Sequence, residues 1–86
     1  MNLEETLRQL LADYGKLSTP VDQLTDTSDL YRAGLTSHAT ITLMLAIEDT
    51  FEVEFPQEVL RKSTFESIKA IAHELTALGV DADGPS

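Results

Sequence analysis

The chain has 86 residues, which is enough for one small domain. It contains 6 basic and 15 acidic residues, so the formal charge of −9 argues against binding to nucleic acid or to an anionic membrane. The same charge favours basic protein partners, although it would also serve merely to keep a small protein in solution. There is no cysteine, so the chain has neither a disulfide nor a catalytic thiol.

The first residues lack the basic start and apolar core of a signal peptide. No apolar run approaches the roughly 18 residues that a membrane span needs. We therefore expect a cytoplasmic protein without membrane partners.

The first helix is predicted at residues 3–14. Asn2 is placed to cap this helix, Glu5 follows three residues later, and Gly15 provides a stop. The apolar residues at helical spacing are Leu3, Leu7, Leu10, Leu11 and Tyr14.

A long connection is predicted at residues 16–35. Pro20 restricts Thr19 to extended geometry, and the stretch "TDTSD" is rich in turn formers. A loop of this length is uncommon unless it is functional or contains short turns of its own. Gly34 is expected to break the backbone just before the next helix. The side chains expected to fix the connection to the core are Val21, Leu24, Leu30 and Tyr31.

The second helix is predicted from Ser37 to about Glu52. Leu43, Ile47 and Phe51 form one buried stripe, and further apolar side chains widen it, so this helix should be central. The alternating "FEVEF" at 51–55 resembles a strand, but it has no second strand with which to pair. After Pro56, the stretch "PQEVLRK" predicts a short helical turn.

The last helix is predicted to start with Ser63 as its cap and Glu66 in a capping box, and to stop at Gly79. Its inward residues are predicted to be Phe65, Ile68, Ile71, Ala72, Leu75 and Leu78. The fold class is therefore all-α: a small four-helix bundle of three main helices and one short one, with a long first loop. A domain at 1–78 is expected to be followed by a disordered tail at 79–86.

The sequence gives little support for a conventional catalytic site. His38 and His73 are far apart in the sequence, and no metal motif, nucleophile elbow or phosphate loop is present. The chain is therefore not expected to be an enzyme. The acids expected on a solvated face are Glu48, Asp49, Glu52 and Glu54.

Ser37 has two interpretations, since it could cap the helix it begins or serve as an attachment point. The segment "AGLTSHATITLMLAIEDTFEVEFP" resembles the attachment segment of acyl carrier proteins and peptidyl carrier domains. The resemblance extends from Leu3 to Leu78. Its matching positions are Asp29, Leu30, Gly34, Leu35, Ser37, Glu48, Asp49, Phe51, Glu54, Phe55, Pro56, Ser63, Thr64, Phe65 and Ile68.

The resemblance implies that a phosphopantetheinyl transferase attaches 4′-phosphopantetheine to the Ser37 hydroxyl. The thiol of this arm would then carry an acyl or aminoacyl group as a thioester. A helix N-terminus beside Ser37 would stabilise the phosphate. A monomer is the default expectation for such a carrier.

Three departures from the usual pattern matter. Thr36 stands where the family usually has Asp, and His38 stands where it usually has Leu. His38 is expected to be exposed, with an ion pair to the phosphate as the alternative. The helix face that is usually acidic carries Ala39, Thr40 and Thr42 instead, which predicts partners other than the enzymes of fatty-acid synthesis.

The stretches "GLTSHATITLMLAIEDTFEVEFP" and "LRKSTFESIKAI" are similar in sequence to stand-alone bacterial aminoacyl carrier proteins. That similarity implies loading by a synthetase-like amino acid:carrier protein ligase and transfer to a downstream acceptor enzyme. The partner contacts expected around the arm are Leu35, Thr36, His38, Ile41 and Leu45. Leu43, Ile47, Phe51, Ile68, Ile71 and Leu75 are assigned to the core, and Met44 to either role.

Alternatives remain. One is an unmodified helical docking module that keeps the carrier fold, and another is a carrier of fatty-acid or polyketide-type chains. A helix-turn-helix regulator is disfavoured by the charge. A hydrolase using Ser37 is disfavoured because the adjacent His38 would not face it on a helix.

Overall fold

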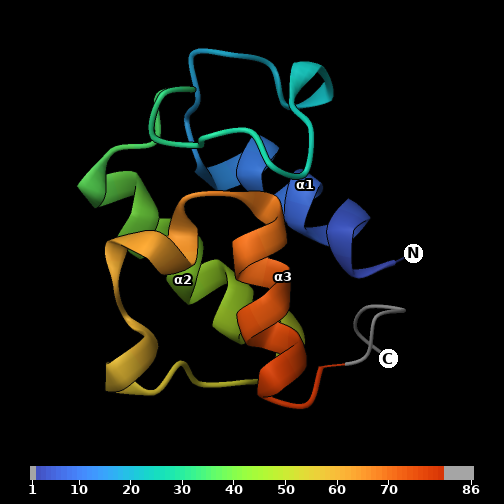
Figure 1. Cartoon of the computed structure of the whole chain (residues 1–86), viewed down its shortest axis with the longest axis vertical. Coiled ribbons are helices and arrows are strands. Elements are labelled where there is room, and N and C mark those ends of the chain that lie inside the picture. The colour runs from blue at the N-terminus through green and yellow to red at the C-terminus, as the bar shows by residue number, and fades with distance from the viewer. Residues whose placement is uncertain (1, 81–86) are drawn as a thin grey trace.

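The computed structural model describes residues 2–80, and these form an all-α fold without strands (Figure 1). The main helices are α1 (Leu3–Tyr14), α2 (Ser37–Phe51) and α3 (Ile68–Ala77). Three short 3-10 helices lie between them: η1 (Val21–Gln23), η2 (Gln57–Val59) and η3 (Lys62–Phe65). The predicted fold class is confirmed, and η2 and η3 stand where one short helix was expected.

A single apolar core holds the helices together, because α1 packs against both α2 and α3 (Figure 1). The side chains assigned to this core from the sequence are all buried. Its members include Leu7, Leu11, Leu30, Leu43, Ile47, Phe51, Ile68, Ile71 and Leu75.

The bounds of α1 agree with the prediction. The Asn2 side chain accepts a hydrogen bond of 2.8 Å from the backbone N–H of Glu5, as an N-cap residue should. Of the apolar residues at helical spacing, Tyr14 is the exposed one, with 42% of its surface accessible. It lies in the last turn, where the core no longer covers the helix.

The start of α3 differs from the prediction. Ser67, not Ser63, caps the helix and accepts a 3.0 Å hydrogen bond from the Ala70 N–H. Ser63 and Phe65 belong to η3, although Phe65 is buried as expected. At the other end, Val80 still packs against the core, while 81–86 of the predicted tail lie outside the described residues.

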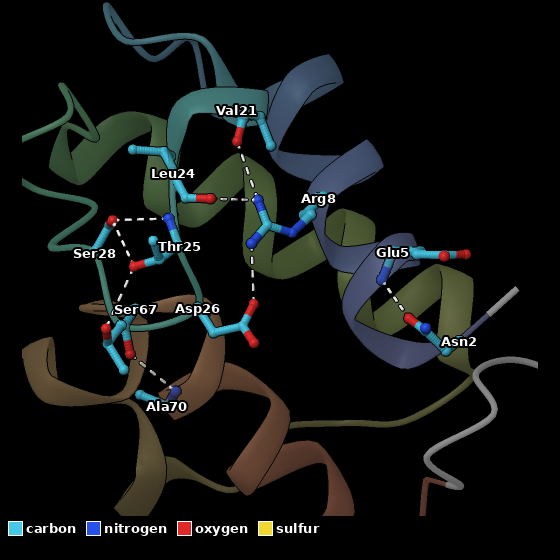
Figure 2. Close-up of polar contacts among 11 residues, drawn as sticks. Asn2, Glu5, Arg8, Val21, Leu24, Thr25, Asp26, Ser28, Ser67 and Ala70 are labelled. Atoms are coloured by element: carbon cyan, nitrogen blue, oxygen red, sulfur yellow. Dashed lines mark hydrogen bonds and ion pairs between the residues drawn. The ribbon is translucent and has the colours of Figure 1, made fainter.

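The connection between α1 and α2 is held by Arg8 (Figure 2). Its guanidinium donates to the carbonyl of Val21 at 3.1 Å and to that of Leu24 at 2.8 Å, and it pairs with Asp26 at 3.0 Å. The four apolar side chains expected to fix this segment do pack on the core, and Leu30 is fully buried. These contacts hold the connection, and with it the start of α2, in a fixed position.

None of the helices within residues 2–80 has the length and apolar character needed to span a membrane.

Candidate functional site

Ser37 is the first residue of α2, and its side chain is exposed. The capping role belongs to Thr36, whose hydroxyl oxygen accepts a 3.0 Å hydrogen bond from the Ala39 N–H. None of the hydrogen bonds among residues 2–80 uses the Ser37 hydroxyl. The structural interpretation of Ser37 as a cap is therefore wrong, and its hydroxyl is available for chemistry at a helix N-terminus.

The approach to Ser37 depends on Gly34. Its φ of +114° lies in a region that L side chains rarely adopt, and an added Cβ would lie 2.8 Å from both the backbone N and the Oγ of Ser18. Ser18 is held there because its N–H donates to the Ala33 carbonyl at 2.8 Å. This close approach fixes the direction in which the chain enters α2.

The expected partner contacts divide into two groups. Leu35 is only 4% exposed and packs in the core, so little of its side chain is open to a partner. Thr36 and His38 are exposed, and the exposed fractions of Ile41 and Leu45 are 57% and 56%. These four are therefore accessible beside Ser37.

A groove of about 700 Å³ opens beside Ser37. One wall belongs to α2 and the other to the segment 60–65, which contains η3. Among residues 2–80, no acidic side chain lines it. The lining residues are Tyr31, Leu35, Thr36, Ser37, Thr40, Ile41, Met44, Leu60, Arg61, Lys62 and Phe65.

Two residues that line this groove, Tyr31 and Lys62, contact each other. The Tyr31 hydroxyl donates a 2.7 Å hydrogen bond to the Lys62 carbonyl, and the Lys62 ammonium lies 5.1 Å from the centroid of the Tyr31 ring. Burial raises the pKa of the Tyr31 hydroxyl, and the nearby Glu66 and Asp29 carboxylates add to the shift. The hydroxyl therefore stays a hydrogen-bond donor at neutral pH. The sequence carried no signal for this contact between positions 31 apart.

Glu48 has a structural role that the sequence analysis missed. Its carboxylate accepts a 2.7 Å hydrogen bond from the Phe55 N–H, so Glu48 was wrongly placed on a solvated face. This contact holds the chain as it leaves α2, where Glu52 adopts a left-handed φ of 54°. Asp49, Glu52 and Glu54 are exposed, as expected.

The two histidines do not form a site. His38 is exposed at the start of α2, as expected, and His73 is exposed on α3. Within residues 2–80, no group of three or more His, Cys, Asp or Glu side chains could hold a metal ion.

Comparison with known proteins identifies relatives. Residues 5–75 match the family described as "Phosphopantetheine attachment site". The "Aminoacyl carrier protein" of Agrobacterium fabrum is 51% identical over 69 residues, which cover 80% of this chain and 83% of that protein.

Solved structures of carrier proteins are also similar to this chain. The carrier protein of Agrobacterium tumefaciens, crystallised with an engineered glycine:[carrier protein] ligase of Bradyrhizobium japonicum and AMP, is 47% identical. It superposes with a TM-score of 0.83, covering 86% of this chain and 99% of that chain. The holo acyl carrier protein of Nitrosomonas europaea is 25% identical, with a TM-score of 0.78 and coverage of 90% and 95%. This chain therefore belongs to the phosphopantetheine attachment-site family of carrier proteins.

Proposed function

We propose that Ser37 carries 4′-phosphopantetheine and that the chain holds an amino acid as a thioester on this arm. The free, exposed hydroxyl of Ser37, with the capping role taken by Thr36, is the observation that carries the proposal. The Thr36 hydroxyl caps the helix in place of the usual Asp, which supports the same proposal.

The residues around Ser37 fit the group. The N–H groups at the start of α2 favour a phosphate there, and the described part of the chain brings no carboxylate to the adjoining groove that would repel it. In the modification, the Ser37 oxygen forms a bond to the phosphorus that bears pantetheine. The phosphoanhydride of coenzyme A breaks, adenosine 3′,5′-bisphosphate leaves, and the transferase accepts the hydroxyl proton. When bound, the arm supplies the thiol that this chain lacks.

An amino acid is the proposed cargo for two reasons. The Agrobacterium relative with 51% identity is an aminoacyl carrier protein, and a 47% identical carrier was solved with a glycine:[carrier protein] ligase. The exposed face of α2 after Ser37 also presents Ile41 and Leu45 instead of carboxylates. Partners that recognise an acidic helix would find little to bind. The proposed partners are a phosphopantetheinyl transferase, an amino acid:carrier protein ligase and a downstream acceptor enzyme, with this chain as their substrate and not itself an enzyme.

The test combines modification with loading. The protein is treated with coenzyme A, Mg²⁺ and a broad-specificity phosphopantetheinyl transferase, and then with ATP, an amino acid:carrier protein ligase and a panel of amino acids. We expect intact mass to show one phosphopantetheine and then one aminoacyl group, which hydroxylamine removes. Modification followed by loading only with fatty acyl groups from an acyl ligase would favour the fatty-acid or polyketide alternative. Failure of the native protein to carry any arm would favour the docking module.

A further inference from the structure

We propose that a face beside Ser37 docks against an acidic patch on the amino acid:carrier protein ligase. The exposed residues that form this docking face are Ile41, Leu45, Leu60, Arg61 and Lys62. The inference rests on the proposed function, because only a carrier of amino acids has such a ligase. The expected partner surface is opposite in sign to the one that the net charge of −9 favours.

The centre of the docking face is apolar. Ile41 and Leu45 are four residues apart, so they lie on the same side of α2, and their exposed fractions are 57% and 56%. Leu60, which is 43% exposed, lines the same groove as Ile41. Exposed apolar side chains that lie together mark protein interaction sites, because a partner that covers them removes apolar surface from water.

Two cations beside this apolar centre are available to a partner. Within residues 2–80, the two ion pairs use Arg8 and Arg32, and neither uses Arg61 or Lys62, whose side chains are exposed. The Lys62 backbone is held in place, because its carbonyl accepts a 2.7 Å hydrogen bond from the Tyr31 hydroxyl. Holding the backbone lowers the entropy that these cations lose when they bind carboxylates.

The acidic residues of α2 lie too far along the helix to set the charge of this face. Residues 36–47 contain no carboxylate. The exposed Asp49 lies about 18 Å from Ser37 along the helix axis, beyond the Debye length of about 8 Å at physiological salt. Glu58 and Glu66 flank the two cations in the sequence but do not line the groove. A partner at Ser37 therefore meets cations and apolar side chains first.

The ligase is the partner that must cover this face. It has to bring a thiol tethered at Ser37 to an activated amino acid, so its surface must lie against the residues around Ser37. Carboxylates opposite Arg61 and Lys62 would accept charge-assisted hydrogen bonds, and an apolar patch would cover Ile41. The same acidic surface would repel carriers with an acidic helix face, and this repulsion would make the ligase specific for its own carrier.

The first test measures the KM of the ligase for the phosphopantetheine-bearing protein. Arg61→Glu/Lys62→Glu should raise this KM at least about fivefold at low salt with little change in kcat, because attractive pairs become repulsive. Lys16→Glu/Arg32→Glu changes the net charge equally but outside the docking face, so KM should stay within about twofold. A fall in KM for the first variant, which a basic ligase surface would give, or an equal rise in both would overturn the inference.

The outcome separates the docking face from the proposed function. Circular dichroism first confirms that each variant is folded. Arg61→Glu alone keeps the Lys62 ammonium 5.1 Å from the Tyr31 ring and should raise KM by a smaller factor. A wild-type protein that takes up no arm or no amino acid would contradict the proposed function itself. Normal loading with an unchanged KM in Arg61→Glu/Lys62→Glu would overturn only the docking face.

The second test identifies the contact directly. A water-soluble carbodiimide joins an amine to a touching carboxylate through an amide bond, and mass spectrometry of the digested complex locates that bond. We expect cross-links from Lys62 to Asp or Glu side chains of the ligase, and none from Lys16. Cross-links formed only between carboxylates of this chain and lysines of the ligase would overturn the inference.

Discussion

The hydroxyl oxygen of Thr36 accepts a 3.0 Å hydrogen bond from the N–H of Ala39, and this contact assigns the cap of α2 to Thr36 and not to Ser37. Thr36→Ala should lower the free energy of unfolding by about 0.5–2 kcal/mol, because an N-cap is lost. Thr36→Ser should retain most of the free energy of unfolding, because serine is also an N-cap residue. Urea denaturation followed by circular dichroism measures both.

Ser37→Ala should leave the same free energy nearly unchanged, because Ser37 is not the cap. A loss as large as that of Thr36→Ala would mean that Ser37 has a structural role. The pair of variants thus tests whether the serine is free for modification.

Gly34 is predicted to be intolerant of a side chain. Gly34→Ala would place a Cβ 2.8 Å from Ser18 while keeping a φ of +114°, so we expect a loss of about 1–3 kcal/mol in the free energy of unfolding. Gly79→Ala is the matched control, since its φ is +99° but no other atom of the described residues lies within 4 Å of its added Cβ. Its smaller loss would report the backbone strain alone. Equal losses would show that the contact with Ser18 is unimportant.

Glu48 is predicted to stabilise the chain after α2. Glu48→Ala leaves the half-buried N–H of Phe55 without its acceptor at 2.7 Å, so stability should fall by about 1–3 kcal/mol. Asp49→Ala, one residue along on an exposed face, should change it by less than about 0.5 kcal/mol. Faster amide hydrogen exchange at Phe55 in the first variant alone would localise the effect.

Arg8 connects stability to pH. The pKa of Asp26 is lowered, first by its hydrogen bond with the Glu4 carboxyl and then by that from Arg8. Ionised Asp26 therefore stabilises the fold above its unfolded pKa of about 3.9, and this contribution is lost as pH falls through the lower folded value. The pKa of Glu4 is raised, first by the same hydrogen bond, so protonation of Glu4 partly offsets that loss.

Arg8→Met should thus lower the free energy of unfolding at pH 7 and make its decline below about pH 4 shallower. Lys16→Met, which removes an exposed cation elsewhere, is the comparison. Thermal unfolding from pH 7 to pH 2 gives both curves. An unchanged slope in Arg8→Met would contradict the assignment of Asp26.

The helices were predictable from the sequence because their apolar periodicity is local. The bounds of α1 follow from its cap and stop residues, and the buried stripe Leu43, Ile47 and Phe51 follows from spacing. The predicted start of α3 was wrong, because Ser67 and not Ser63 is the cap in the structure. Two hydrogen bonds join the start of α3 to the connection between α1 and α2. The Leu30 N–H donates to the Glu66 carbonyl at 2.8 Å, and the Lys69 N–H donates to the Asp26 carbonyl at 2.9 Å.

The candidate site was predictable in part. Ser37 was identified from its resemblance to carrier proteins, and the exposure of Ile41 and Leu45 agrees with their predicted role as surface contacts. The groove could not be predicted, because it forms where segment 60–65 meets α2. The burial of Leu35 could not be predicted, since a residue next to a turn gives no pattern that reveals it.

The central claim is that Ser37 bears the arm. The most direct measurement is tandem mass spectrometry of peptides from the protein purified from its native cell or coexpressed with a phosphopantetheinyl transferase. The account predicts that the phosphopantetheine mass, and its characteristic ejected pantetheine fragment, occur only on the peptide containing Ser37. The arm on another serine, or a fully unmodified protein in the native cell, would contradict the account.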